Sequence, residues 1–275
     1  MLADRFRTAG QRFFCCLDAQ FNISISIHNS LSSRYGRQAE SRPLKINQFF
    51  YGGDNLGYLL HQGGEALAID GGAVDAILTF VERNRLALTR VTNTHGHADH
   101  TTGTRKLLQA GGGRYLDHRQ FSDGQSIDIG GEPITVRRTP GHTADSVIFA
   151  ADDFLVTGDT LFNGTVGNCF SGDLRAFYDS IRLIMAYPET TRIYAGHDYV
   201  HESLAVARRL TPDNRAIDEY AARYDQHHVV STLADELAVN PYLRFNAPEI
   251  VRLIESRGLP TDTEYRCWEG IMAIE

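Results

Sequence analysis

The sequence is poor in lysine, in cysteine and in long apolar runs. No apolar stretch among its 275 residues reaches the roughly 18 residues that a membrane-spanning helix needs, which excludes an integral membrane protein. Its four cysteines are too few and too scattered for a disulfide framework, so we expect a reducing, cytoplasmic location. Lys45 and Lys106 are the only lysines, and the net charge is -7. With no basic stripe, we expect neither a nucleic-acid nor a membrane partner.

Three regions differ in their patterns. Residues 1–42 are rich in arginine and serine and show no strand or helix period, which predicts a poorly ordered extension, with an organellar targeting segment as the alternative. In residues 43–205, short apolar strands and helical segments form two successive strand-then-helix halves. This order is typical of an α/β fold, an αββα sandwich of two mixed β-sheets flanked by helices. Residues 206–275 form helical segments split by prolines, which predicts a C-terminal helical domain.

One stretch of seven residues, Thr94 to His100, contains three histidines and an aspartate. It follows a strand predicted at residues 90–94 and precedes a helix predicted at residues 101–110, which places it on a loop. Imidazole and carboxylate groups suit zinc, iron or manganese. Side chains of this kind so close together would repel one another or stay unsatisfied without a cation. We therefore predict that this stretch binds metal.

Three further candidate ligands, His142, Asp159 and His197, each follow an apolar strand at a glycine corner. Alone, each would be read as an ordinary loop or turn residue. Ligands that extend from strand ends at one edge of a sandwich form a rigid metal site. The ligand count predicts two metal ions: one held by His95, His97 and His142, the other by Asp99, His100 and His197, with Asp159 bridging both.

Asp70 ends a predicted strand just before Gly71 and Gly72. We predict that it holds a ligand histidine from outside the metal shell, with a turn-capping role as the alternative.

These ligand positions resemble the signature of the metallo-β-lactamase superfamily, His-x-His-x-Asp-His followed by a distant His, an Asp and a last His. Within it, the chain is similar to glyoxalase II, also called hydroxyacylglutathione hydrolase. The similarity includes residues 158–162 and 195–199 and, in the helical tail, the segments 231–236 and 240–244. The resemblance implies two zinc ions, with iron or manganese as alternatives, and a small-molecule thioester substrate, possibly linked to glutathione. It leaves the oligomeric state open.

The predicted mechanism is metal-dependent hydrolysis. A hydroxide that bridges the two metals would attack the thioester carbonyl, and Asp99 or Asp159 would orient it or take its proton.

The family resemblance also assigns substrate contacts, and these depart from the pattern. Where glyoxalase II uses a Lys and a Tyr to hold glutathione, this chain has Asn168 and Phe170. Where the family has an Arg and, three residues later, a Lys in its C-terminal substrate-binding domain, this chain has Arg266 and Glu269. Loss of a charge-assisted contact weakens binding by roughly 1.5 to 3 kcal/mol.

An oxidoreductase of the same fold, a persulfide dioxygenase with a single iron, is the alternative function. A merely structural metal site is disfavoured, because such sites do not keep open coordination positions.

Overall fold

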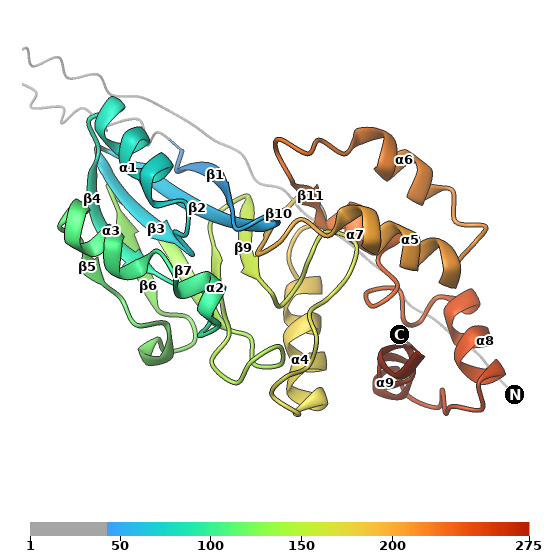
Figure 1. The fold of residues 1–275 in the computed structure, drawn as a ribbon. Helices are drawn as coiled ribbons and strands as arrows, with labels where there is room; N and C mark the ends of the chain where they lie inside the picture. The colour runs from blue at the N-terminus through green and yellow to red at the C-terminus, as the bar shows by residue number, and fades with distance from the viewer. Residues whose placement is uncertain (1–42, 275) are drawn as a thin grey trace, which may run out of the picture. The chain divides into compact units, whose positions relative to one another are not determined.

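The computed structural model describes residues 43–274, so the predicted N-terminal extension lies outside the described residues. Two mixed sheets form the centre of this part of the chain (Figure 1). The strands of the first sheet are, in spatial order, β1 (Lys45–Tyr51), β2 (Asn55–Gln62), β3 (Glu65–Ile69), β4 (Ala87–Thr92) and β5 (Arg114–Tyr115). Those of the second are β11 (Ser231–Thr232), β10 (Arg192–Ala195), β9 (Phe154–Gly158), β8 (Val147–Ala150), β7 (Glu132–Arg138) and β6 (Ser126–Ile129).

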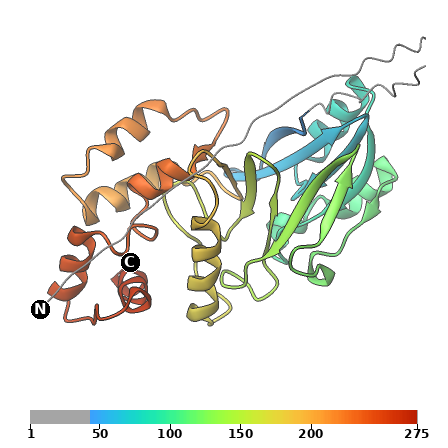
Figure 2. The same cartoon turned by 180° about the vertical axis from the view of Figure 1, so that it is seen from behind.

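The helices fall into two sets. Those within the sandwich region are α1 (Val74–Arg83), α2 (Ala98–Thr101), α3 (Thr104–Gly111), the 3-10 turn η1 (His118–Gln120) and α4 (Leu174–Met185). Those of the C-terminal region are α5 (Val200–Leu210), α6 (Ala216–Arg223), α7 (Leu233–Val239), α8 (Pro248–Ser256) and α9 (Glu264–Ile274). Figures 1 and 2 show α1 and α3 beside the first sheet and α4 beside the second.

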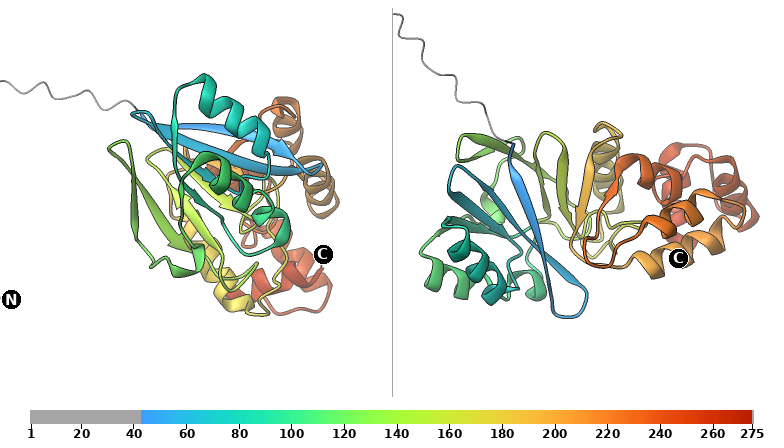
Figure 3. Two further views of the ribbon diagram at one scale, coloured as in Figure 1. Left: turned by 60° about the vertical axis from the view of Figure 1, so that its left-hand side comes forward. Right: turned by 90° about the horizontal axis from the view of Figure 1, so that it is seen from above.

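Alternating side chains explain this layering, because successive residues of a strand point to opposite faces of its sheet. Tyr58 of β2 belongs to the core between the two sheets, whereas its neighbour Leu59 packs in a separate cluster with Ile77 of α1. In the second sheet, Leu155 of β9 packs in a cluster with Phe177 of α4. Both sheets therefore bury both faces, and the predicted αββα sandwich is confirmed (Figure 3).

The strands carry the candidate ligands to one edge. Strand β4 ends two residues before the histidine cluster, and β7, β9 and β10 end shortly before His142, Asp159 and His197. Because β9 and β10 run parallel, their carboxyl ends lie side by side. The hairpin of β1 and β2 reaches the same edge, since Asn55 forms a bridge with His197.

Two details of the sequence prediction were wrong. The cluster does not lie wholly on a loop, because Asp99 and His100 belong to the helical turn α2. The helix predicted at residues 101–110 is interrupted at Thr102 and Gly103 before α3 begins. Gly103 packs tightly on the chain near Gly71, where an added Cβ would lie 2.0 Å from the Gly71 carbonyl oxygen. The two-residue strands β5 and β11 were not predicted, because they are too short to show a period.

The predicted domain boundary between residues 205 and 206 falls inside α5. Leu204 and Ala207 of this helix belong to the same core cluster as Phe149 of the second sheet. The first helix of the C-terminal region is therefore packed into the core of the sandwich. Helix α7 begins with a capping box, in which Thr232 and Asp235 accept hydrogen bonds from each other's backbone N–H groups.

Candidate metal centre

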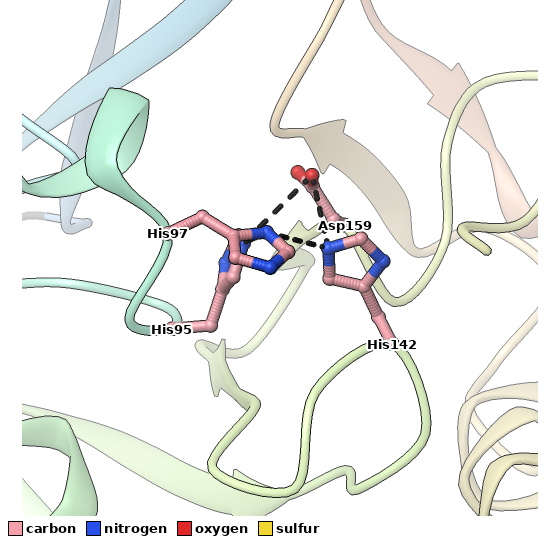
Figure 4. Close-up of side chains that lie close together, drawn as sticks. All are labelled: His95, His97, His142 and Asp159. Carbon is pink, nitrogen blue, oxygen red and sulfur yellow. Dashed lines mark hydrogen bonds and ion pairs between the residues drawn. The ribbon is translucent and has the colours of Figure 1, made fainter. Parts of the chain in front are cut away.

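The first group of candidate ligands consists of three histidines and one aspartate that converge on one point (Figure 4). Nε2 of His95 lies 2.9 Å from Nδ1 of His97, and Nε2 of His142 lies 3.1 Å from the same atom. Oδ2 of Asp159 lies 3.8 Å from Nε2 of His95 and 3.4 Å from Nε2 of His142. All four side chains can therefore meet a single ion.

The second group contains Asp99, His100 and His197. The Nε2 atoms of the two histidines are 3.2 Å apart, and Oδ2 of Asp99 lies 3.5 Å from His100 and 3.3 Å from His197. Asp159 also contacts this group, with Oδ1 at 3.2 Å from Nε2 of His100 and Oδ2 at 3.5 Å from Nε2 of His197. Asp159 therefore lies within reach of both groups.

The hydrogen bonds of the ring nitrogens that face away from the cluster show whether the ligand residues suit a cation. Nδ1 of His142 donates to the carbonyl oxygen of Asn168 at 2.9 Å, while Nδ1 of His197 lies 3.1 Å from an Asp54 carboxylate oxygen. An oxygen acceptor requires the proton on Nδ1, so each neutral ring presents the lone pair of Nε2 inward. Facing lone pairs repel unless a cation lies between them. Oδ1 of Asp159, buried and without a hydrogen-bond partner, is a further candidate donor atom.

The pKa directions of His95 and Asp159 suit metal binding. Burial and, after it, the neighbouring His100 together lower the pKa of His95 to about 3. For Asp159, burial raises the pKa, but the adjacent His100 and His197 rings outweigh burial and lower it below the usual range. Burial lowers the pKa of His100 and of His197, but the carboxylates of Asp70 and Asp159 beside His100, and of Asp159 beside His197, outweigh burial and raise it. At neutral pH, His95 is therefore neutral and Asp159 is ionised, the forms that coordinate a metal ion.

Asp70 lies beside two of the candidate ligand histidines. It is fully buried, and Oδ2 lies 3.0 Å from Nδ1 of His100 and accepts from the Thr94 hydroxyl at 2.7 Å. Oδ1 accepts from the Thr94 backbone N–H at 2.8 Å. Thr94 Oγ1 in turn lies 3.0 Å from Nδ1 of His95. One carboxylate therefore contacts one histidine directly and reaches a second through Thr94.

Two residues near the site were missed by the sequence analysis. Asn55 donates to Oδ2 of Asp99 at 2.9 Å, and Asp54 contacts Nδ1 of His197. Asp54 and His197 are 143 residues apart in the chain. The only local signal was a polar pair after the turn at Gly52 and Gly53, and such a pair is common in ordinary turns.

The predicted substrate contacts lie at the exposed rim or away from the cluster. Phe170 is 66% exposed, and its ring meets those of His97 and His142 edge-on at 5.6 and 5.3 Å. The Asn168 side chain is also exposed, although its backbone carbonyl holds His142. Arg266, on α9, is exposed and forms an ion pair with Glu269. No contact between Arg266 and the metal groups is found among residues 43–274.

Comparison with known proteins gives two family matches. Residues 113–197 match the model of the metallo-beta-lactamase superfamily, and residues 198–266 match that of the hydroxyacylglutathione hydrolase C-terminus. The chain is 34% identical to the hydroxyacylglutathione hydrolase of Methylobacillus flagellatus over 220 residues, 74% of this chain and 88% of that protein. It is 35% identical to the hydroxyacylglutathione hydrolase of Anaeromyxobacter dehalogenans over 222 residues, 74% of this chain and 87% of that protein. The chain therefore belongs to the hydroxyacylglutathione hydrolase family, within the metallo-β-lactamase superfamily, as its ligand motifs indicated.

Solved structures show the same fold. ETHE1 from Myxococcus xanthus is 26% identical with a TM-score of 0.60, covering 78% of this chain and 92% of that one. The BLEG-1 B3 metallo-beta-lactamase is 21% identical with a TM-score of 0.56, covering 72% of this chain and 99% of that one. The second similarity concerns the fold alone.

Proposed function

We propose that this protein hydrolyses hydroxyacylglutathione-type thioesters with two divalent metal ions, and that zinc is the native metal. The chain is a metal-dependent hydrolase of this family. The observation that carries the finer proposal is Asp159, whose two carboxylate oxygens reach both ligand groups.

We assign one metal ion to each of the two ligand groups. His95, His97 and His142 would hold one ion, Asp99, His100 and His197 the other, and Asp159 would coordinate both. The ions would lower the pKa of a coordinated water and polarise the thioester carbonyl.

Two carboxylates are suited to orient or accept the proton. Burial raises the pKa of Asp99, but the hydrogen bond from Asn55 and the nearby His100 outweigh burial, so its pKa is lowered. The Asp99 side chain is 45% exposed and can reach solvent, whereas Asp159 is enclosed. Asp99 is therefore the better placed to pass a proton to bulk water.

The substrate contacts are part of the proposal. Phe170 and Asn168 would line the approach to the first metal group, and Arg266 would contribute positive charge from the helical C-terminal region. The exposure of all three side chains supports a role in recognition, because exposed loop residues on a rigid scaffold are common binding groups.

The test is a thioester panel with metal analysis on one preparation. We expect the zinc-loaded protein to hydrolyse S-lactoylglutathione or a related acyl thioester and to contain two zinc ions per chain. No turnover of any thioester would refute the proposal. One iron per chain with oxygen consumption would instead identify the oxidoreductase alternative.

We also propose a cytoplasmic location. Among the described helices, none is long and apolar enough to cross a membrane. Cys169 and Cys267 are free thiols, which suits a reducing compartment. Cell fractionation with an antibody against the protein would test this, and recovery in an organelle would indicate that residues 1–42 direct transport.

A further inference from the structure

Glu236 of α7 is a fully buried carboxylate that takes no part in the proposed reaction. Three donors converge on it. The Ser231 hydroxyl donates to Oε1 at 2.7 Å, the Gly164 backbone N–H donates to Oε2 at 2.8 Å, and the Asn240 amide donates to Oε2 at 3.0 Å. Ser231 and Asn240 belong to the C-terminal region, whereas Gly164 follows the candidate bridging residue, Asp159, in the chain.

The contacts with Gly164 tie the C-terminal region to residues 160–168, which we call the metal-loop segment. The Asn240 amide donates a second hydrogen bond to the Thr165 carbonyl oxygen at 3.1 Å. Within the segment, the Asn163 amide donates to the Ser231 hydroxyl oxygen at 2.7 Å. The segment is therefore held by hydrogen bonds from a single small cluster around Glu236.

The other end of the metal-loop segment reaches the first metal group. The carbonyl oxygen of Asn168 accepts the hydrogen bond from Nδ1 of His142. At Gly167, an added Cβ would lie 2.8 Å from Nδ1 of His142 and 2.1 Å from the Asp159 carbonyl oxygen. The segment is thus in tight contact with His142, and a displacement at Gly164 would be passed on to this ring.

We propose that Glu236 is a positioning residue that fixes the metal-loop segment and, through the Asn168 carbonyl, the orientation and tautomer of His142. This inference rests on the proposed function only in that it treats His142 as a metal ligand. It assigns the C-terminal region a second task besides substrate contact, namely to brace a residue of the metal centre.

The chemistry of the cluster explains why a carboxylate is used. Two oxygens without protons can accept all three donors at once, and no neutral side chain of this size has the same acceptor capacity. The pKa of Glu236 is raised to about 7, chiefly by burial and in smaller part by the nearby Asp235 charge. Hydrogen bonds from Ser231, Asn240 and Gly164 act in the opposite direction, so the group is ionised in mildly alkaline buffer.

The test compares Glu236→Ala and Glu236→Gln with a matched control, Ile254→Ala. Ile254 is equally buried, lies on α8 and packs near Gly270 of α9. Its truncation removes packing in the C-terminal region but none of the hydrogen bonds to the metal-loop segment. Three quantities are measured at pH 8: the imidazole 15N and Nδ1–H signals of His142 in metal-free protein, zinc affinity by chelator competition, and kcat and KM.

We expect Glu236→Ala to shift the His142 signals, to weaken zinc binding by about 10- to 100-fold and to lower kcat more than it raises KM. Glu236→Gln should recover part of each effect, because its amide oxygen still accepts from Gly164 and Asn240. Ile254→Ala should lower the melting temperature but leave the His142 signals and zinc affinity unchanged.

Unchanged His142 signals in both Glu236 variants, or the same shifts in Ile254→Ala, would overturn the inference. If Glu236→Ala does not fold, the test depends on Glu236→Gln alone, for which we expect a smaller shift of the His142 signals in the same direction. The metal-free measurement does not depend on turnover. Failure of the wild-type protein to hydrolyse thioesters would therefore refute the proposed function without affecting this result.

Discussion

The buried centre and the exposed rim of the candidate site are held in different ways. In the centre, Asp70 and Asp159 are at most 6% exposed, and each contacts two or more other groups of the site. At the rim, Phe170 is 66% exposed and touches the centre only through ring edges. Arg266 is exposed and pairs with Glu269 on its own helix.

The contrast in burial separates the groups proposed to carry out the reaction from those proposed to select the substrate. Under the proposed function, the buried groups would determine the reaction type, because moving one of them disturbs several partners at once. The rim side chains can change without loss of fold, so we propose that they tune the thiol carrier that is accepted. The predictions below test this separation, from the largest expected free-energy effect to the smallest.

Replacement of Asp159, the proposed bridging residue, should have the largest effect. Asp159→Asn keeps the shape of the side chain but removes its charge and one metal-binding oxygen. We expect kcat/KM for S-lactoylglutathione to fall about 10³-fold or more, with loss of metal. Steady-state kinetics and metal analysis measure both. Asp152→Asn, at an exposed turn, is the control and should retain wild-type values. Near-normal activity of Asp159→Asn would show that this carboxylate does not bridge.

Glu236 should make stability depend on pH. Its pKa is raised from 4.5 to about 7 in the folded state, so the folded protein binds the proton more tightly than the unfolded chain. The stability from this group is fully present below pH 4.5 and is lost as pH rises through 7, by about 3 kcal/mol. Urea unfolding of the wild type and of Glu236→Gln is measured between pH 5 and 8. The loss appears as a change with pH in the difference between the two free energies of unfolding. A constant difference would contradict it.

Asp70→Asn should weaken metal binding without removing a ligand. Asp70 has φ of 50°, a left-handed conformation that asparagine tolerates, so the backbone should be retained. The amide accepts through only one oxygen and cannot hold both Thr94 and His100 as the carboxylate does. We expect metal affinity to fall about 10- to 100-fold in chelator competition. Asp75→Asn, at an exposed position of α1, is the control. Equal metal affinity in both variants would argue for a turn-capping role of Asp70.

Much of the fold could be predicted from local patterns. The strands β6, β8 and β10 and the helix α4 each coincide with a local sequence pattern. The strands are short apolar runs bounded by glycine or charged turns, and the helix has an apolar face with helical spacing. The seven candidate ligands are brought together because each follows the end of a strand.

The remainder depends on contacts that no local pattern records. Asp54 and His197 meet across 143 residues, and Asn168 supports His142 through a backbone carbonyl that any residue could supply. Glu236 resembles any acidic residue in the first turn of a helix until the fold brings Gly164 against it. Sequence patterns therefore locate ligands more readily than the groups that orient them.

At the rim, Phe170→Ala should affect binding more than chemistry. Its edge contacts with His97 and His142 stabilise the position of its loop by about 0.5 to 1.5 kcal/mol. We expect KM to rise about 2- to 10-fold, with a smaller change in kcat and unchanged metal content. Phe50→Ala is the control, because Phe50 is the other large exposed hydrophobic side chain among residues 43–274. A large loss of metal from Phe170→Ala would break the distinction between centre and rim.

The smallest effect should come from charge at α9. The Arg266 side chain is 49% exposed and the Glu269 side chain 34%, and ion pairs this exposed contribute about 0 to 1 kcal/mol. Glu269→Lys frees Arg266 and adds a second positive charge, which should favour the carboxylates of a glutathione thioester. We expect kcat/KM to rise several-fold at low ionic strength, and the gain to vanish at high salt because exposed charges are screened. Glu189→Lys changes net charge equally at another exposed position. An equal gain in both variants would mean that only net charge matters and that α9 does not contribute to substrate recognition.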